Sequence, residues 1–187
     1  MNQFLIIIAT FVTFLEDGTN LNEKTKYIED ARLIYNSYDV CEWIKAGFDE
    51  NSGGYCVYHK EHQFSSTGGG GRAEKIVGKI LKNKGKQIEF LPEIKDKNSD
   101  IKFDEQTWDI KYINNANFKT IRGYIQDVLK KKSDNCIFYF TKSEVFEELR
   151  KATDMEVGKM KKLERINEMP NIYYIFETET LKLLWKK

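Results

Sequence analysis

Residues 136–140, Cys-Ile-Phe-Tyr-Phe, constrain the fold of this chain more than any other segment. An extended segment with no strongly polar position on either face predicts a strand that other elements cover on both sides. The flanking residues 118–132 and 143–168 both have helical patterns, and apolar positions recur every three or four residues in the first of them. A buried strand between two helices predicts an α/β protein with a mixed sheet.

The rest of the chain supplies further elements by the same criteria. Helices are predicted over residues 23–38 and 73–83, and the second ends in lysines and Gly85, as is typical of a helix C-terminus. The turn Asp104-Glu105-Gln106 joins two short strands that we expect to form a hairpin. Strands are predicted over residues 55–59, 87–91, 101–103, 107–113 and 172–176, the last of these being the final strand. From the second helix onward, the predicted order is α, β, β, β, α, β, followed by helical and strand additions.

Four consecutive glycines at residues 68–71 divide the sequence. Glycine loses more backbone freedom than other residues when it becomes ordered, so we expect this run to interrupt helices and strands and to act as a hinge. With 187 residues, the chain is long enough for one domain and an accessory segment. We therefore predict an N-terminal accessory segment over residues 1–63 and a main domain over residues 64–187.

Composition excludes several classes of protein. A chain with 41% hydrophobic residues, two prolines and no low-complexity tract is neither disordered nor fibrous. Three widely spaced cysteines argue against a disulfide framework and for a reducing, cytoplasmic site of action. The apolar run at residues 4–15 is too short to span a bilayer comfortably. It predicts a core strand or helix, and no membrane partner is expected.

The charges are divided unevenly along the chain. Residues 1–70 carry five basic and ten acidic side chains, whereas residues 71–187 carry 25 basic and 19 acidic side chains. A polyanionic partner therefore belongs with the second part. Three lysine clusters there suit either a phosphate backbone or ordinary solvated helix ends. These lysines are at positions 79, 82, 84 and 86, at 130–132, and at 159, 161 and 162.

The residues predicted to contact nucleic acid are His59, His62, Lys119 and Arg122.

Acidic and basic residues gather at the predicted hairpin. Asp109 and Lys111 are two apart on one strand, so their side chains share a face of the sheet, while Ile110 points the other way. Asp100 begins the partner strand, where its carboxylate is expected to meet that of Asp109. Two carboxylates suit Mg²⁺ or another divalent cation, and Lys111 would orient the attacking water or stabilise transition-state charge. Glu74, on the preceding helix, would complete the metal site or hold the nucleophile.

These residues carry a resemblance to known nucleases. Glu74, Ser99-Asp100 and Asp109-Ile110-Lys111 resemble the motif of the PD-(D/E)xK nuclease superfamily, with Ser99 in the place of its proline. The segments Phe90-Leu91-Pro92-Glu93 and Trp108-Asp109-Ile110-Lys111, with the helix and strand that follow, resemble more narrowly the C-terminal tRNase domains of bacterial contact-dependent inhibition toxins. The resemblance covers residues 72–141.

The resemblance implies a fold, a reaction and partners. The fold is a restriction-endonuclease-like α-β-β-β-α-β core, which would make residues 64–187 a nuclease-like domain. The catalytic residues are Glu74, Asp100, Asp109 and Lys111, and the ligands of the divalent cation are Asp100 and Asp109. The implied activity is metal-dependent endoribonuclease cleavage of RNA, with tRNA as substrate, by a bacterial toxin or mobile-element domain. Such a protein acts in the cytoplasm, is delivered into a bacterial target cell, and has an immunity protein as partner.

Two other functions stay open on the sequence. In a metal-independent RNase similar to the barnase, colicin and RelE-like group, protein acids and bases move the protons. Lys111, Thr120, Arg122 and one of the histidines His59 and His62 would then carry the reaction. In a non-catalytic binding module, the same carboxylates form surface ion pairs, which contribute little.

Overall fold

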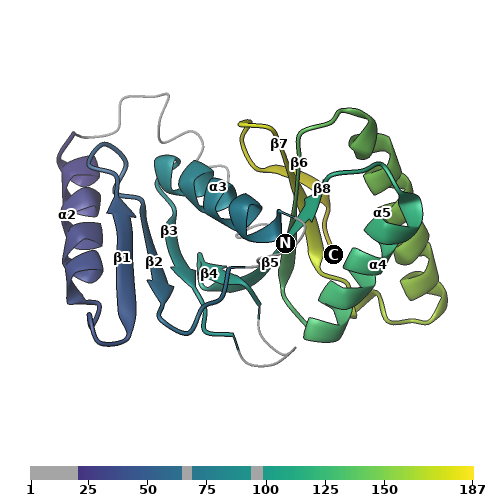
Figure 1. The fold of residues 1–187 in the computed structure, drawn as a ribbon, viewed down its shortest axis with the longest axis horizontal. Coiled ribbons are helices and arrows are strands. Elements are labelled where there is room, and N and C mark those ends of the chain that lie inside the picture. Colours follow the sequence, from purple (N-terminus) through teal and green to yellow (C-terminus); the bar gives the residue numbers. More distant parts are fainter. Residues whose placement is uncertain (1–20, 65–68, 94–98) are drawn as a thin grey trace.

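The computed structural model of the chain describes residues 21–64, 69–93 and 99–187. These residues form one mixed eight-stranded sheet, four α-helices and a short 3₁₀ helix (Figure 1). The predicted mixed α/β class is confirmed. In chain order the elements are α2 (Leu21–Ser37), β1 (Trp43–Phe48), β2 (Tyr55–His59), α3 (Gly70–Asn83), β3 (Gln87–Phe90), β4 (Ile101–Phe103), β5 (Gln106–Ile113), α4 (Phe118–Lys131), β6 (Asn135–Phe140), α5 (Glu144–Lys162), η1 (Ile166–Glu168), β7 (Asn171–Phe176) and β8 (Lys182–Trp185).

The strands lie in the sheet in their order along the chain, from β1 to β8. The pairs β2/β3, β5/β6 and β6/β7 are parallel, and the chain crosses between each pair through a helix, α3, α4 or α5. Parallel neighbours need such a crossover, whereas antiparallel neighbours can be joined by a short turn. The predicted hairpin is confirmed as β4 and β5, and its turn residues Asp104 and Glu105 have φ values of 50° and 58°. Positive φ at two successive turn residues is the geometry that a two-residue hairpin requires.

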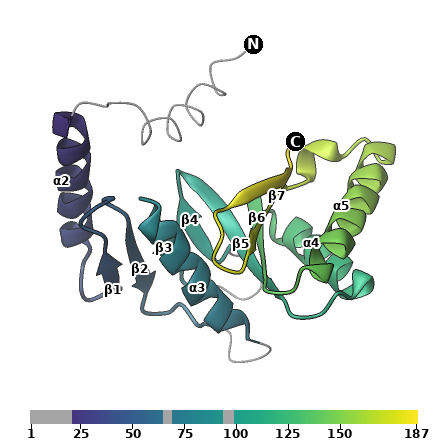
Figure 2. The same cartoon turned by 90° about the horizontal axis from the view of Figure 1, so that it is seen from above.

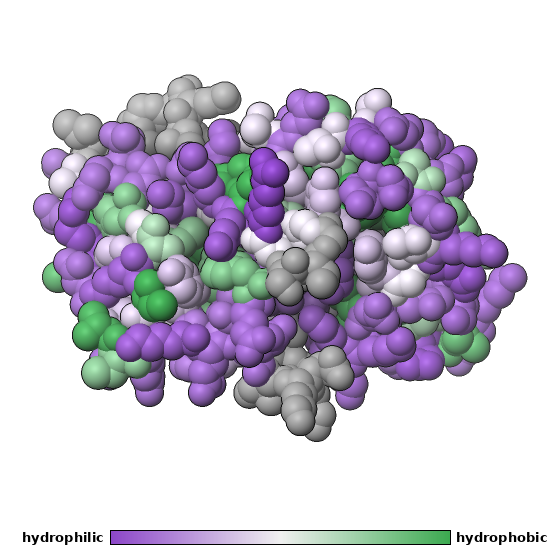
Figure 3. All heavy atoms as spheres, in the orientation of Figure 1, coloured by the Kyte–Doolittle hydropathy of each residue, from purple (hydrophilic) through white to green (hydrophobic). Residues whose placement is uncertain are grey.

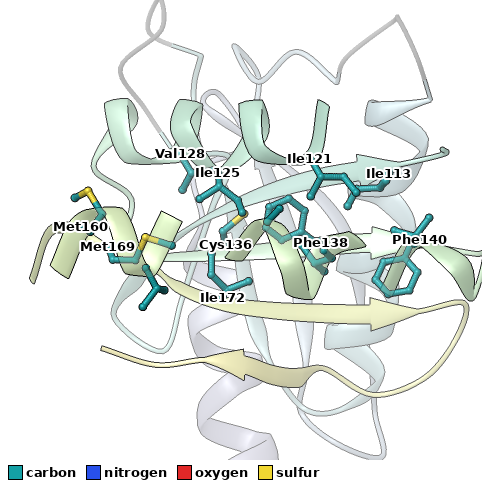
Figure 4. Close-up of a cluster of buried hydrophobic side chains, with 14 residues drawn as sticks. Ile113, Ile121, Ile125, Val128, Cys136, Phe138, Phe140, Met160, Met169 and Ile172 are labelled. Carbon is teal, nitrogen blue, oxygen red and sulfur yellow. The ribbon is translucent and has the colours of Figure 1, made fainter. Parts of the chain in front are cut away.

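Strand β6 is buried along its whole length, as its sequence predicts. Cys136, Phe138 and Phe140 pack against α4 and α5, and Figure 4 shows them facing residues of α4. Ile137 and Tyr139 point to the opposite face, where they join a second apolar cluster with residues of α3. In Figure 1, strands β5–β7 are seen nearly edge-on, with α3 on one side of the sheet and α4 and α5 on the other. The sheet therefore has two separate apolar cores.

The sheet is continuous across residue 63, the predicted domain boundary. Strand β2 pairs in parallel with β3, and α2 lies at the far end of the sheet from α4 and α5 (Figure 2). The Tyr27 hydroxyl donates a hydrogen bond of 2.9 Å to the Gly85 carbonyl, and the Tyr38 hydroxyl donates to Glu89. Hydrogen bonds and strand pairing thus join the predicted accessory segment to the rest of the chain.

Four details differ from the sequence predictions. Strand β1 lies where no strand was predicted, at the edge of the sheet with a bulge between Lys45 and Gly47. Strand β8 follows the strand predicted to be the last, on the other edge. The helix predicted to reach residue 168 ends at Lys162, and Glu164 has a positive φ of 57°. Edge strands are short and half exposed, so their sequences lack a clear alternation.

The fourth difference concerns the glycine run. Gly70 and Gly71 form the first turn of α3, so the prediction that the run interrupts helical structure is wrong for these two residues. Gly69, just before them, has a left-handed φ of 81° and lies against the Tyr112 ring, where a Cβ would come within 3.1 Å of the ring. Glycine is favoured there by backbone geometry and space. Ser65 and Gly68 lie outside the described residues, as does the predicted apolar element at residues 4–15.

The surface is hydrophilic over most of the face in Figure 3. Apolar side chains gather where α2 and β1 lie, and Leu33, Ile34, Val40 and Ile44 are the exposed ones of this end. Within the described parts of the chain, no helix has the length and apolar character needed to cross a membrane.

Gly54 tests how closely the predicted accessory segment packs on the rest of the chain. A Cβ at Gly54 would lie 1.9 Å from the Lys82 carbonyl oxygen at the end of α3, whereas one at Gly123 in α4 would meet nothing within 4 Å. We expect Gly54→Ala to lower the free energy of unfolding by about 1–3 kcal/mol. Gly123→Ala should raise it by about 0.5–1 kcal/mol because alanine is the better helix former. Urea unfolding measures both, and equal stabilities for Gly54→Ala and the parent chain would contradict the close packing.

Candidate active site at the β4–β5 hairpin

The register of the β4–β5 hairpin brings two carboxylates together. Ile101 pairs with Trp108, so Asp100 and Asp109 are the next pair along the ladder. Their carboxylates lie near one ammonium group, with Lys131 Nζ 2.9 Å from Asp109 Oδ1 and 3.4 Å from Asp100 Oδ1. The Asp109 side chain is 0% exposed and that of Asp100 is 19% exposed. This is a largely buried acidic pair with a cation between its members, so it differs from a solvated surface ion pair.

Asp100 also completes the hydrogen bonding of the neighbouring strand. Strand β4 has only three residues, so the β5 backbone continues beyond the end of its partner. The Ile110 backbone N–H donates a hydrogen bond of 2.7 Å to Asp100 Oδ2, and a buried N–H needs such a partner. One carboxylate oxygen of Asp100 therefore accepts a hydrogen bond from the backbone, and the other accepts one from Lys131.

Lys111 is the second ammonium group of the cluster. It lies two residues after Asp109 on the same face of β5, and its Nζ is 3.4 Å from Asp109 Oδ1. Lys131 reaches the cluster from the last turn of α4, which ends when Lys132 adopts a left-handed φ of 60°. With Asp100 and Asp109 ionised, the two lysines make the cluster formally neutral.

Two buried serines continue the network behind Asp109. The Ser133 hydroxyl donates to Asp109 Oδ2, and Ser99 Oγ lies 2.7 Å from Ser133 Oγ. Ser99 is the residue at the position of the motif's proline. Its hydroxyl thus helps to fix Ser133, which holds the carboxylate of Asp109.

The charges in this cluster influence one another. Burial raises the pKa of Asp100, and the negative charge of Asp109 raises it further, while Lys111 and Lys131 oppose the rise. Burial alone would lower the pKa of Lys131, but Asp100 and Asp109 outweigh this effect and raise it. Lys131 is therefore held as a cation. Perturbed ionisable groups that converge in this way are typical of functional sites.

The donor set fits a magnesium ion that keeps most of its waters. The described parts of the chain contain no group of three or more His, Cys, Asp or Glu side chains arranged to hold a metal. Asp100 and Asp109 would thus be the carboxylate ligands that these parts supply. Mg²⁺ is commonly bound in this way, by one or two carboxylates with waters and substrate phosphate oxygens in its other positions.

Glu74 forms no ion pair with the lysines of this cluster among the described residues. It is carried by α3, whose apolar residues pack on the face of the sheet that holds Trp108 and Ile110. Asp109 and Lys111 point to the opposite face, because side chains alternate along β5. Glu74 instead contacts His62, with Glu74 Oε2 3.3 Å from His62 Nε2. Asp100 lies close enough to the same ring to raise the pKa of His62, and the joint role of Glu74 with the aspartates stays a prediction.

The residues predicted to contact nucleic acid are in four different environments. His62 is buried, and its Nδ1 lies 2.7 Å from the Leu91 carbonyl oxygen. His59 packs its ring edge-on against Trp43. Arg122 forms an ion pair with Glu156 of α5, whereas Lys119 is exposed in the first turn of α4.

A polar pocket lies at the other end of α4 from Lys131. Its volume is about 410 Å³, and it opens where β5 leads into the helix. Asn117 caps the helix there by accepting a hydrogen bond from the Thr120 N–H. The lining residues are Ile113, Asn114, Asn115, Ala116, Asn117, Thr120 and Tyr124. Thr120 is thus separated from Lys131 by most of the length of α4, whereas Lys111 lies on β5 two residues before the pocket residue Ile113.

The structure defines the protein as a mixed α/β protein with a buried carboxylate–lysine cluster at the edge of a hairpin. Comparison with family models, curated proteins and solved structures finds no match to this chain.

The His62–Glu74 pair gives a stability that depends on pH. Burial lowers the pKa of His62, but the Glu74 carboxylate, the Leu91 carbonyl and the negative charge of Asp100 outweigh it, and the net shift is upward. Glu74 and Leu91 accept hydrogen bonds from the ring, so they favour its doubly protonated form. Because the pKa is higher in the folded state than in the unfolded state, the protonated His62 ring stabilises the fold. This stabilisation is complete below the unfolded-state pKa of about 6.5, and it is lost as the pH rises through the folded-state pKa.

We therefore expect His62→Gln to cost about 1–3 kcal/mol at pH 5.5 and clearly less at pH 8.5. Urea unfolding at both values measures the difference from the parent chain. His59→Gln is the matched control, because His59 lies against the Trp43 ring and is not held by Glu74. A cost of His62→Gln that is equal at the two pH values would contradict the assignment.

A variant of Arg122 can distinguish its predicted role in nucleic-acid binding from a structural role in the ion pair with Glu156. Its partner Glu156 is 1% exposed and also accepts a hydrogen bond from Gln126. Arg122→Met would leave a buried carboxylate without its cation, and we expect a loss of about 3 kcal/mol in unfolding free energy. The exposed Lys119→Met should change it by less than about 0.5 kcal/mol. Full stability of Arg122→Met, with weakened nucleic-acid binding, would favour the predicted contact role instead.

Proposed function

We propose that this protein is a metal-dependent nuclease whose active site is the cluster of Asp100, Asp109, Lys111 and Lys131. The observation that supports the proposal is the register of the hairpin, which places two carboxylates within 3.4 Å of one ammonium nitrogen. Keeping two acidic groups and two amines together in a mostly buried place is costly. Binding of a cation and a phosphate by these four residues would explain why the protein keeps such a costly arrangement.

Each residue has a role in the proposed reaction. Asp100 and Asp109 would hold Mg²⁺, which would supply Lewis-acid stabilisation of the charge that develops on the phosphate. Lys111, on the same face as Asp109, would orient the attacking water or contact a phosphate oxygen. Ser133 fixes the orientation of Asp109 by donating to its second oxygen. Glu74 would support the site through His62, which it contacts and whose pKa the charge of Asp100 also raises.

The finer class follows from the sequence resemblance, and it belongs to the same proposal. The order α3, β3, β4, β5, α4, β6 agrees with a restriction-endonuclease-like core. By that resemblance the substrate is RNA, specifically tRNA, and the protein is a bacterial toxin or mobile-element endoribonuclease with an immunity protein. It would act in the cytoplasm of the target cell.

The metal-independent mechanism is the main competitor. No contact joins its residues into one group, because Thr120 lines the pocket at the start of α4, Arg122 pairs with Glu156, and His62 pairs with Glu74 in the described parts of the chain. Lys111 belongs to both mechanisms. The non-catalytic alternative requires ordinary surface ion pairs, and the complete burial of Asp109 argues against that alternative.

Nuclease activity is the direct test. We expect the purified protein to cleave RNA in Mg²⁺ and to lose activity in EDTA. Asp100→Asn should lower the rate at least about 100-fold, because the carboxylate charge is removed while its amide oxygen still accepts from Ile110. Total tRNA, other RNA and plasmid DNA, each analysed by gel electrophoresis, identify the substrate class.

The control variant is Asp127→Asn, which removes an exposed carboxylate on α4 that pairs with Lys130 and does not contact the cluster. Circular dichroism and thermal unfolding show whether each variant keeps its fold. Full activity of the parent chain in EDTA would transfer the assignment to the metal-independent class. Absence of cleavage for every substrate in every divalent metal would overturn the proposal.

A further inference from the structure

Lys131 contacts both members of the acidic pair. Its Nζ is 2.9 Å from Asp109 Oδ1 and 3.4 Å from Asp100 Oδ1, whereas Lys111 contacts only Asp109 among the ion pairs of the described residues. Two carboxylates facing each other form a place for a cation, and an ammonium group takes that place in this structure. From the sequence, Lys131 was expected only as part of a lysine cluster that suits either a phosphate backbone or a solvated helix end.

The hydrogen-bonding capacity of Asp109 is largely used. Its Oδ1 accepts from Lys111 and Lys131, and its Oδ2 accepts from Ser133. A carboxylate oxygen has about two acceptor sites. A metal ion that binds Oδ1 must therefore replace one of the two ammonium groups on that atom.

Charge leads to the same requirement. The two aspartates and two lysines are formally neutral together, so a divalent cation would enter a site that already contains its counter-charges. Two positive charges a few ångströms apart repel strongly in a largely buried environment. Release of one ammonium group reduces that repulsion, and release of Lys131 frees an acceptor site on Oδ1 of both aspartates.

We propose that Lys131 is a built-in competitor for the divalent cation, which leaves the Asp100–Asp109 pair when the metal binds. Lys131 is suited to this exchange because it lies in the last turn of α4 and its side chain is 23% exposed. A long lysine side chain can move its amine toward solvent or toward a substrate phosphate while its stem stays packed. This inference rests on the proposed metal site and specifies what controls its affinity.

Removing the competing charge should strengthen metal binding. Lys131→Met keeps the length of the side chain and removes the ammonium group, so we expect the Kd for Mn²⁺ to fall at least about tenfold in isothermal titration calorimetry. Lys130→Met is the matched control, because Lys130 is the neighbouring residue, is 77% exposed and pairs with Asp127. Its Kd should equal that of the parent chain.

A second measurement uses the unmodified protein, so it holds even if Lys131→Met fails to fold. Lysine acetylation with a water-soluble reagent, followed by mass spectrometry, reports how freely each amine reacts. Saturating Mn²⁺ should increase labelling of Lys131 several-fold, because the ammonium group leaves its two carboxylates. Labelling of Lys130 should stay unchanged.

The outcomes separate this inference from the proposed function. Metal binding by the parent chain with an equal or weaker affinity in Lys131→Met, or with no gain in Lys131 labelling, would overturn the competitor role and leave the metal site standing. Absence of Mn²⁺ binding in both the parent chain and Lys131→Met would overturn the metal site itself. Binding that survives Asp100→Asn would also place the metal elsewhere.

Discussion

Asp109 is a charged side chain with no exposed surface, next to the strand that lies between two apolar cores. An unpaired carboxylate in such a place would cost several kcal/mol, so the surrounding structure must supply positive charge and hydrogen bonds. Lys111 comes from the same strand, and Lys131 and Ser133 come from the end of the next helix. The position of α4 is therefore as important to this carboxylate as the hairpin that carries it.

The β5–α4–β6 crossover explains why these groups meet. Asp109 pairs in register with Cys136 near the start of β6, so the residues just before β6 must return to the level of Asp109. Lys131 and Ser133 are those residues. The other end of α4 lies at the carboxyl end of β5, which places the polar pocket at the opposite end of the helix from Lys131. One crossover thus fixes which charges are close and which are distant.

Much of the fold was predictable from local patterns, because periodicity and turns are local properties. The pairing of Asp100 with Asp109 and the shared face of Lys111 follow from a short hairpin with strict alternation. The contact of Glu74 with His62 did not follow, because nothing in the helix sequence says which residue of another element Glu74 meets. The edge strands β1 and β8 were missed for a related reason, since their exposure weakens the alternation that marks interior strands.

The position of Lys131 beside the acidic pair could have been predicted from the sequence. Once residues 107–113 and 136–140 are taken as parallel neighbours, the helix between them must end beside the first half of the earlier strand. Of three consecutive lysines at that end, one in the last helical turn can face the sheet while its neighbours face solvent, as Lys130 does. The sequence predicted either a phosphate-binding cluster or a solvated helix end, whereas the structure places Lys131 on a buried acidic pair. Because the two lysines already balance the two aspartates, the affinity of this cluster for a divalent cation would depend on how easily it releases one of its own ammonium groups.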